Sequence, residues 1–215
     1  MSPEAEAAFA AQADQNRYAR KQTERKLYEA TSQRLSEELR INNSGVEPTE
    51  YHKTKQIEAT PGAPSRNGDV LVPGYDVDGK LWTVQYIKED GTKRFAKDSR
   101  KHGCFHPVGA PNGATALQQV AMSPVVVIAE GYATAATIAK HGKVPTLAAY
   151  DSGNLLSVAT SIRERWPDKA IIITGDDVTG SKIIPAGKKH QRRPRPPPAL
   201  RYSPTQRRTA CERID

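Results

Sequence analysis

Apolar and polar positions between residues 123 and 178 alternate in a way that predicts a sheet of parallel strands. Apolar runs occupy 125–129, 144–149 and 170–174, and segments that read as helices lie between them at 132–141 and 154–165. The connections between these elements are short. Strands that alternate with helices in this order favour parallel pairing and a doubly wound α/β arrangement.

A different pattern covers residues 69–122. Asp78-Gly79 and Asp90-Gly91 are strong hairpin signals, because tight hairpin turns need positive φ angles that glycine adopts at little cost. Between these turns Trp82, Val84 and Tyr86 alternate with the residues beside them, which gives the segment two distinct faces. The pattern predicts a small antiparallel β module.

The region before this module is charged and rich in helix formers. Residues 1–50 predict one long helix, or two, and their sparse apolar positions suit a helix that projects or packs through a narrow stripe. Residues 51–68 are rich in Pro and Gly and predict a linker. The expected fold class is therefore α+β: an N-terminal helix, a small antiparallel β module, and an incomplete α/β domain with a parallel sheet.

The formal charge of +8 belongs to one end of the chain. Residues 179–215 contain ten Lys and Arg, two acids and six prolines, whereas residues 1–178 carry no net charge. This composition predicts a disordered basic tail. Because the sequence has no signal-peptide pattern, no apolar run of transmembrane length and no disulfide framework, we expect a cytoplasmic protein without a membrane partner.

Acidic residues follow two of the predicted parallel strands. Glu130 comes directly after the run at 125–129, and Asp176 and Asp177 follow the run at 170–174. Ligands bind at the carboxyl edge of open α/β sheets, and Mg²⁺ prefers one or two carboxylates together with phosphate oxygens and water. The three acids therefore predict a site for Mg²⁺ (or Mn²⁺) that handles phosphates. The alternative for each acid is a helix cap or a solvated turn.

Three separated motifs in this region resemble the Toprim domain of plasmid and phage DNA primases, with the conjugative-transfer primases as the nearest type. The motifs are Ala129-Glu130-Gly131-Tyr132-Ala133-Thr134-Ala135, Ala149-Tyr150-Asp151-Ser152-Gly153-Asn154-Leu155 and Thr174-Gly175-Asp176-Asp177. The segment with Asp90-Gly91-Thr92-Lys93-Arg94-Phe95 is similar to the module that precedes Toprim in these enzymes. The resemblance covers roughly residues 52–177.

The resemblance implies a DNA primase that transfers nucleotides with Mg²⁺ in plasmid or phage replication or conjugation. Glu130 matches the glutamate that acts as general acid/base, and Asp176 matches the first aspartate of a metal-binding Asp-x-Asp motif. Val178 stands at the second aspartate's position, and Asp177 is the middle residue. The partners implied are a single-stranded DNA template, nucleoside triphosphates, and replication or conjugation proteins.

The resemblance stops at residue 177. With suitable synonymous codons, residues 178–190 read one base out of register approach the family's continuation, so we expect residues 178–215 to be an out-of-frame tail on a truncated copy. An active nucleotidyltransferase and an inactive remnant are both compatible with this sequence. Two other classes stay open: a non-catalytic nucleic-acid-binding protein that uses its basic tail, and a Toprim nuclease.

Lys93 and Arg94 follow the second hairpin turn and are candidates for contacts with phosphates or template. A solvated strand face explains the same pair equally well.

Overall fold

Local sequence patterns fold into two sheets and five helices in the described part of the chain. The computed structural model describes residues 2–41, 45–175 and 184–185. The helices are α1 (Pro3–Ile41), α2 (Glu50–Lys55), α3 (Gly113–Met122), α4 (Tyr132–Gly142) and α5 (Ser152–Arg165). The strands are β1 (Ser65–Arg66), β2 (Asp69–Tyr75), β3 (Leu81–Ile87), β4 (Lys93–Phe95), β5 (His106–Pro107), β6 (Val125–Ala129), β7 (Thr146–Ala148), β8 (Ala170–Thr174) and β9 (Ile184–Pro185). The expected α+β class is confirmed.

The first sheet is the antiparallel module predicted from its hairpins. Its order is β1-β2-β3-β4, and Val72 of β2 pairs with Gln85 of β3. Both predicted turns form, with Gly79 at φ +80° and Gly91 at φ +84°, in the left-handed region that favours glycine.

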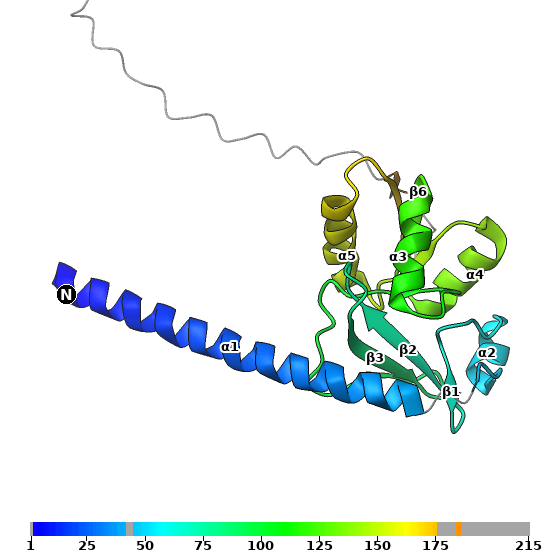
Figure 1. Cartoon of the computed structure of the whole chain (residues 1–215), viewed down its shortest axis with the longest axis horizontal. Coiled ribbons are helices and arrows are strands. Elements are labelled where there is room, and N and C mark those ends of the chain that lie inside the picture. The colour runs from blue at the N-terminus through cyan, green and yellow to red at the C-terminus, as the bar shows by residue number, and fades with distance from the viewer. Residues whose placement is uncertain (1, 42–44, 176–183, 186–215) are drawn as a thin grey trace, which may run out of the picture.

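This small sheet lies between α1 and the α/β part of the molecule (Figure 1). Alternation along β2 places Leu71 on the side of α1, where it packs with the fully buried Leu35. The neighbouring residues Val70 and Val72 face the other way and pack with Tyr132 of α4. Strands β2 and β3 are therefore buried on both faces, and the buried residues of α1 lie in its second half.

The second sheet has the order β5-β7-β6-β8-β9. Its three central strands are parallel, with Ala129 of β6 opposite Ala148 of β7 and Thr174 of β8. Antiparallel strands flank them: His106 of β5 pairs with Ala148, and Ile184 of β9 pairs with Ile173. The parallel strands confirm the predicted α/β arrangement, and the flanking strands were not predicted.

The segment predicted as a linker, residues 51–68, contains regular structure. Helix α2 and strand β1 lie in or beside it, and both Tyr51 and His52 of α2 are buried. Tyr51 packs in the same cluster as Tyr132, so the segment forms part of the core between the two sheets. The tail at 179–215 lies outside the described residues except for β9.

None of the helices in the described ranges, α1 included, combines the length and the apolar character that a membrane span requires.

Candidate functional site

Glu130 lies at the carboxyl end of β6, where the backbone turns into α4. Its backbone N–H donates to the carbonyl of Thr174 at 3.0 Å, which extends the pairing of β6 with β8 by one residue. Gly131 is the N-cap residue of α4. The Glu130 carboxylate points toward the end of β8, because a Cβ placed on Gly175 would lie 3.8 Å from Oε2.

The predicted metal site is only partly within the described chain. Asp176 and Asp177 lie outside the described residues, so their convergence with Glu130 stays a prediction. Within residues 2–41, 45–175 and 184–185, no group of three or more His, Cys, Asp or Glu side chains is placed to hold a metal ion. The Glu130 carboxylate beside Gly175, directly before the two aspartates, fits an ion that takes one or two carboxylates plus phosphate oxygens and water.

Asp151 is a third acid at this edge, and sequence reasoning gave it no role. It follows β7, and as the N-cap residue of α5 it accepts a hydrogen bond from the Asn154 backbone N–H at 3.1 Å. Its other carboxylate oxygen pairs with Lys101 Nζ at 2.5 Å, and both side chains are part-exposed. An acid three residues after a second parallel strand was the signal that could have identified it.

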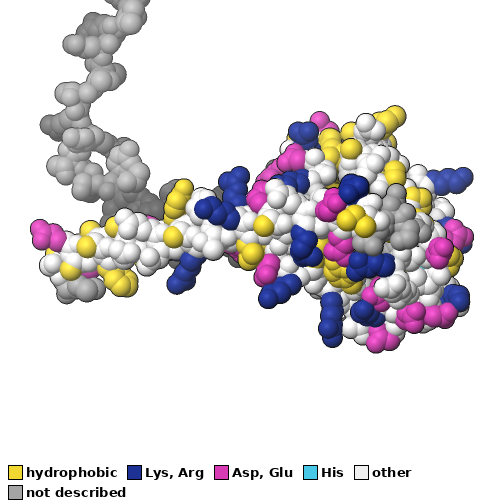
Figure 2. Space-filling model, turned by 60° about the horizontal axis from the view of Figure 1, so that its bottom comes forward, with side chains coloured by type: hydrophobic (Ala, Val, Ile, Leu, Met, Phe, Trp, Pro, Cys, Tyr) yellow, Lys and Arg dark blue, Asp and Glu magenta, His cyan; other side chains and the backbone are white. Residues whose placement is uncertain are grey.

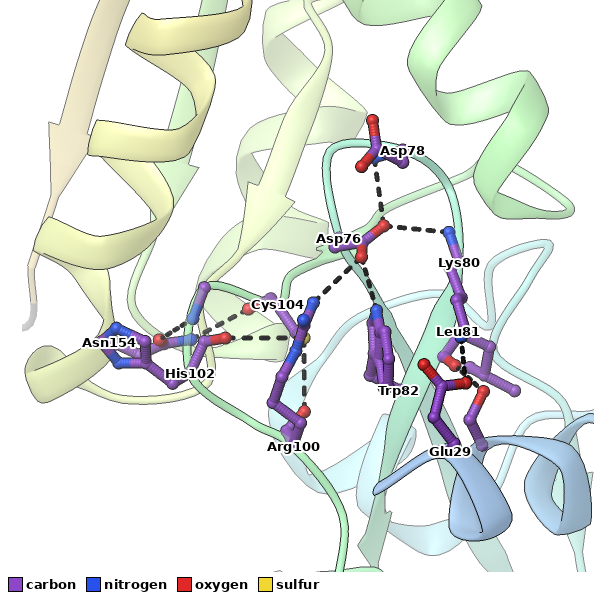
Figure 3. A network of polar contacts seen from close by, with 12 residues as sticks. Glu29, Asp76, Asp78, Lys80, Leu81, Trp82, Arg100, His102, Cys104 and Asn154 are labelled. Atoms are coloured by element: carbon purple, nitrogen blue, oxygen red, sulfur yellow. Dashed lines mark hydrogen bonds and ion pairs between the residues drawn. The ribbon is translucent and has the colours of Figure 1, made fainter. Parts of the chain in front are cut away.

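The loop that carries Lys101 is held from both sides, as Figure 3 shows. On one side Arg100 donates to Asp76 at 3.0 Å and stacks 4.0 Å from the Trp82 ring. On the other side the Gly103 N–H donates to Asn154 Oδ1, and Asn154 Nδ2 donates to the carbonyl of Cys104, both at 2.9 Å. These contacts fix the backbone on either side of Lys101 and so place its ammonium group against Asp151.

The structure separates the two predicted nucleic-acid contacts, Lys93 and Arg94. A Cβ placed on Gly131 would lie 3.9 Å from Lys93 Nζ, so this ammonium group lies beside the turn that carries Glu130. Arg94 is paired with Tyr86 across β3 and β4 and projects toward the side of α1. Only Lys93 therefore belongs to the acidic edge.

Two buried tyrosines, Tyr132 and Tyr150, pack in the core next to the carboxyl ends of β6 and β7. Tyr132 is the first residue of α4, and its hydroxyl lies 3.0 Å from Thr60 Oγ1. Tyr150 follows β7 with a left-handed φ of +78°, and Phe95 packs edge-on against it at 5.3 Å. Burial raises the pKa of both tyrosines above its ordinary value, so they stay neutral. They support the site without contributing charge to it.

A pocket of about 780 Å³ lies at the other end of the parallel strands, before β6 and β7. Ile57, Val108 and Val144 contribute its apolar lining. The acid at its rim, Glu58, is paired with Lys140 at 2.9 Å. The pocket lacks a free carboxylate pair and is remote from Glu130, so we place the candidate chemistry at the carboxyl edge.

Similarity to known proteins points to DNA primases. The chain is 43% identical over 179 residues to a DNA primase TraC of Escherichia coli, an alignment that covers 82% of this chain and 16% of that protein. It is 47% identical over 154 residues to a second Escherichia coli protein named DNA primase TraC, with 71% of this chain and 10% of that protein covered. The chain therefore corresponds to a small part of these relatives.

No protein-family profile matches the chain, and no solved structure matches it. The similarity to the two primases therefore relates most of the chain to primases without defining a Toprim domain.

Proposed function

We propose that the chain is a DNA-primase-like module of the Toprim type, which joins nucleotides on a single-stranded DNA template in plasmid replication or conjugation. The observation that carries the proposal is the 43–47% identity to two DNA primases over most of the chain. The acidic carboxyl edge with Glu130 supports it, because that edge is where open α/β sheets bind ligands.

Each charged side chain at the edge has a role in this proposal. The Glu130 carboxylate accepts the proton of a primer 3′-hydroxyl as the oxygen attacks the α-phosphate of a nucleoside triphosphate, and pyrophosphate leaves. Lys93, beside the Glu130 turn, supplies positive charge to the phosphates, and Lys101, whose charge Asp151 balances, donates a hydrogen bond to them. Asp151 orients Lys101 through their ion pair.

Glu130, Asp176 and Asp177 are the residues that would hold Mg²⁺ or Mn²⁺. When bound, the ion supplies neutralisation of charge on the transferred phosphate. Lys93 of β4 would add positive charge from an element that precedes the parallel sheet in the chain.

The test is oligonucleotide synthesis by the full chain, with single-stranded DNA, labelled nucleoside triphosphates and Mg²⁺. We expect Glu130→Gln to lower synthesis by about 100-fold or more, the range typical of a lost general base. Glu164→Gln is the matched control, because Glu164 is an exposed acid in the last turn of α5. Equal rates for wild type and Glu130→Gln would contradict the proposed role.

The same reactions separate the other classes. A nuclease shortens the labelled template in a Glu130-dependent way and makes no product from the triphosphates. A truncated copy without turnover makes no product but still binds Mn²⁺ through Glu130. A protein that acts only through its basic tail binds DNA with no dependence on Glu130 or on the metal.

A further inference from the structure

A second charged region lies on the side of the small sheet away from Glu130. A groove of about 630 Å³ runs between α1 and strands β1, β3 and β4, and we call it the α1–β4 groove. It is lined by five cations, Arg34, Arg66, Lys88, Arg94 and Lys97, and by two acids. Figure 2 shows Lys and Arg side chains, with Asp and Glu side chains among them, projecting from α1 and from the adjoining body.

Two of the lining cations, Arg34 and Arg66, belong to a cluster built around Glu38 of α1. Arg66 lies 3.0 Å and Arg34 3.6 Å from its carboxylate, while the Tyr86 hydroxyl donates to it at 3.2 Å. Glu38 is well shielded, at 18% side-chain exposure, whereas Arg34 is 57% exposed. Two guanidinium groups on one carboxylate leave a net positive charge, and their fork geometry suits phosphate oxygens.

Two further cations extend this charge along the edge strand. Arg94 stands opposite Tyr86 in the β3–β4 register, and Lys97 follows β4. Both side chains are exposed, and no ion pair joins either of them to another residue of the described ranges. Lys88, in contrast, is neutralised by Asp69 at 2.6 Å. Asp98, which also lines the groove after β4, balances one of the charges of Arg94 and Lys97, so one surplus positive charge remains beside β4.

Strand β4 connects this groove with the acidic edge. Its adjacent residues point to opposite faces, so Arg94 serves the groove while Lys93 reaches the turn at Gly131. A single nucleotide bound at Arg94 does not reach Lys93, because the two side chains lie on opposite faces of the edge strand. A continuous strand passing over β4 contacts both, which favours a polymer over a mononucleotide as the occupant.

We propose that the α1–β4 groove binds the sugar-phosphate backbone of single-stranded nucleic acid and leads it over β4 to the Glu130 edge. Helix α1 then forms one wall of the path, through Arg34. The inference deepens the proposed function by adding a strand-binding surface outside the α/β domain, and it rests on that function only for the direction of the path. Binding itself requires neither metal nor turnover.

The experiment measures binding of a fluorescent single-stranded oligonucleotide to the full chain by anisotropy, in EDTA. We expect Arg34→Ala/Arg94→Ala to weaken binding about 10-fold at low salt and to reduce the slope of log affinity against log salt by about 1.4, or 0.7 for each lost phosphate contact. The control pair is Arg17→Ala/Arg165→Ala, which removes two exposed arginines outside the groove. Equal losses in the two pairs would overturn the proposal.

Two further arms locate the strand and identify the ligand. An oligonucleotide with a photoreactive base should crosslink to the peptide that holds Tyr86 and Phe95, and crosslinks confined to residues 186–215 would overturn the groove. ATP without metal should compete poorly, since efficient competition would make the groove a nucleotide site. Arg34→Lys/Arg94→Lys keeps the charge but loses the forks, so we expect intermediate affinity with an unchanged melting temperature.

The proposal for the α1–β4 groove and the proposed catalytic role of Glu130 are tested independently. Glu130→Gln should bind the oligonucleotide as wild type does in EDTA. If the groove variants lose binding while Glu130→Gln leaves synthesis intact, the groove stands and the catalytic assignment fails. If Glu130→Gln abolishes synthesis while the groove variants bind normally, the catalytic assignment stands and the groove proposal fails.

Discussion

At the residue scale, one hydrogen bond positions the buried side chain of His106 in the core. His106 on β5 is fully buried, and because the Pro73 carbonyl only accepts, its Nδ1 carries the proton in their 2.9 Å hydrogen bond. Its Nε2 has no partner among the described residues. Burial lowers the pKa of His106 to about 4, against the partly offsetting effect of the Pro73 hydrogen bond.

This depressed pKa makes the stability of the fold sensitive to acid. Between the ordinary pKa of 6.5 and about 4, the unfolded chain binds a proton that the folded chain does not, so stability is fully present above pH 6.5 and is lost as the pH falls toward 4. The loss amounts to about 3 kcal/mol over that window. Urea unfolding at pH 7 and pH 5 should show about 2 kcal/mol of this loss.

A non-titrating variant isolates the contribution of His106. His106→Asn offers an amide donor in place of Nδ1–H, and we expect it to reduce the loss between pH 7 and pH 5. Some pH dependence remains, because burial also lowers the pKa of His52. His141→Asn, at an exposed position of α4, is the control and should behave as wild type. An unchanged pH dependence in His106→Asn would contradict the assignment.

The residues of the acidic edge differ in how far the sequence alone could single them out. Glu130 stood out because it directly follows a buried apolar run, although a helix cap or a solvated turn was its alternative, and its role in a site stays a prediction. Asp151 was missed because an acid before a helix also reads as an N-cap, which it is. Lys101 pairs with Asp151 across 50 residues of sequence, and no local pattern encodes such a contact.

At the scale of elements, segments with an unbroken apolar run were predicted closely, and short segments without such a run were not. The strands at 125–129 and 170–174 have the bounds that the sequence predicts, because their apolar runs end at an acid or a glycine. Helix α2 has six residues, too few to show a period, and its neighbourhood of Pro and Gly favoured a linker. Its stability comes from burial of Tyr51 rather than from helix propensity.

Helix α1 provides a test at this scale, because its two halves have different environments. Leu35 is fully buried against the small sheet, whereas Leu27 is 44% exposed. We expect Leu35→Ala to lower the free energy of unfolding by about 2–5 kcal/mol, the range for a buried leucine. Leu27→Ala should change it by less than about 0.5 kcal/mol.

Thermal unfolding followed by circular dichroism measures both variants of α1. Equal melting temperatures for Leu35→Ala and Leu27→Ala would show that α1 does not pack on the sheet in solution. The wall that Arg34 contributes to the α1–β4 groove would then be lost as well.

At the scale of the whole molecule, the small sheet joins two charged regions. Its face toward α1 borders the α1–β4 groove, and its opposite face packs on the α/β part with the acidic edge. The edge strand β4 contributes one cation to each side. The arrangement explains how a body with no net charge in residues 1–178 presents separate cationic and acidic surfaces.

The central claim is that the acids following β6 and β8 converge on one divalent ion, and Mn²⁺ binding to the full chain tests it most directly. Electron paramagnetic resonance counts free Mn²⁺ during a titration. We predict one bound ion whose affinity falls about 10-fold or more in Glu130→Gln and in Asp176→Asn, while Glu164→Gln binds as wild type, because inner-sphere ligands lie within ~2.6 Å of the ion. Binding that is unchanged in both Glu130→Gln and Asp176→Asn would contradict the account.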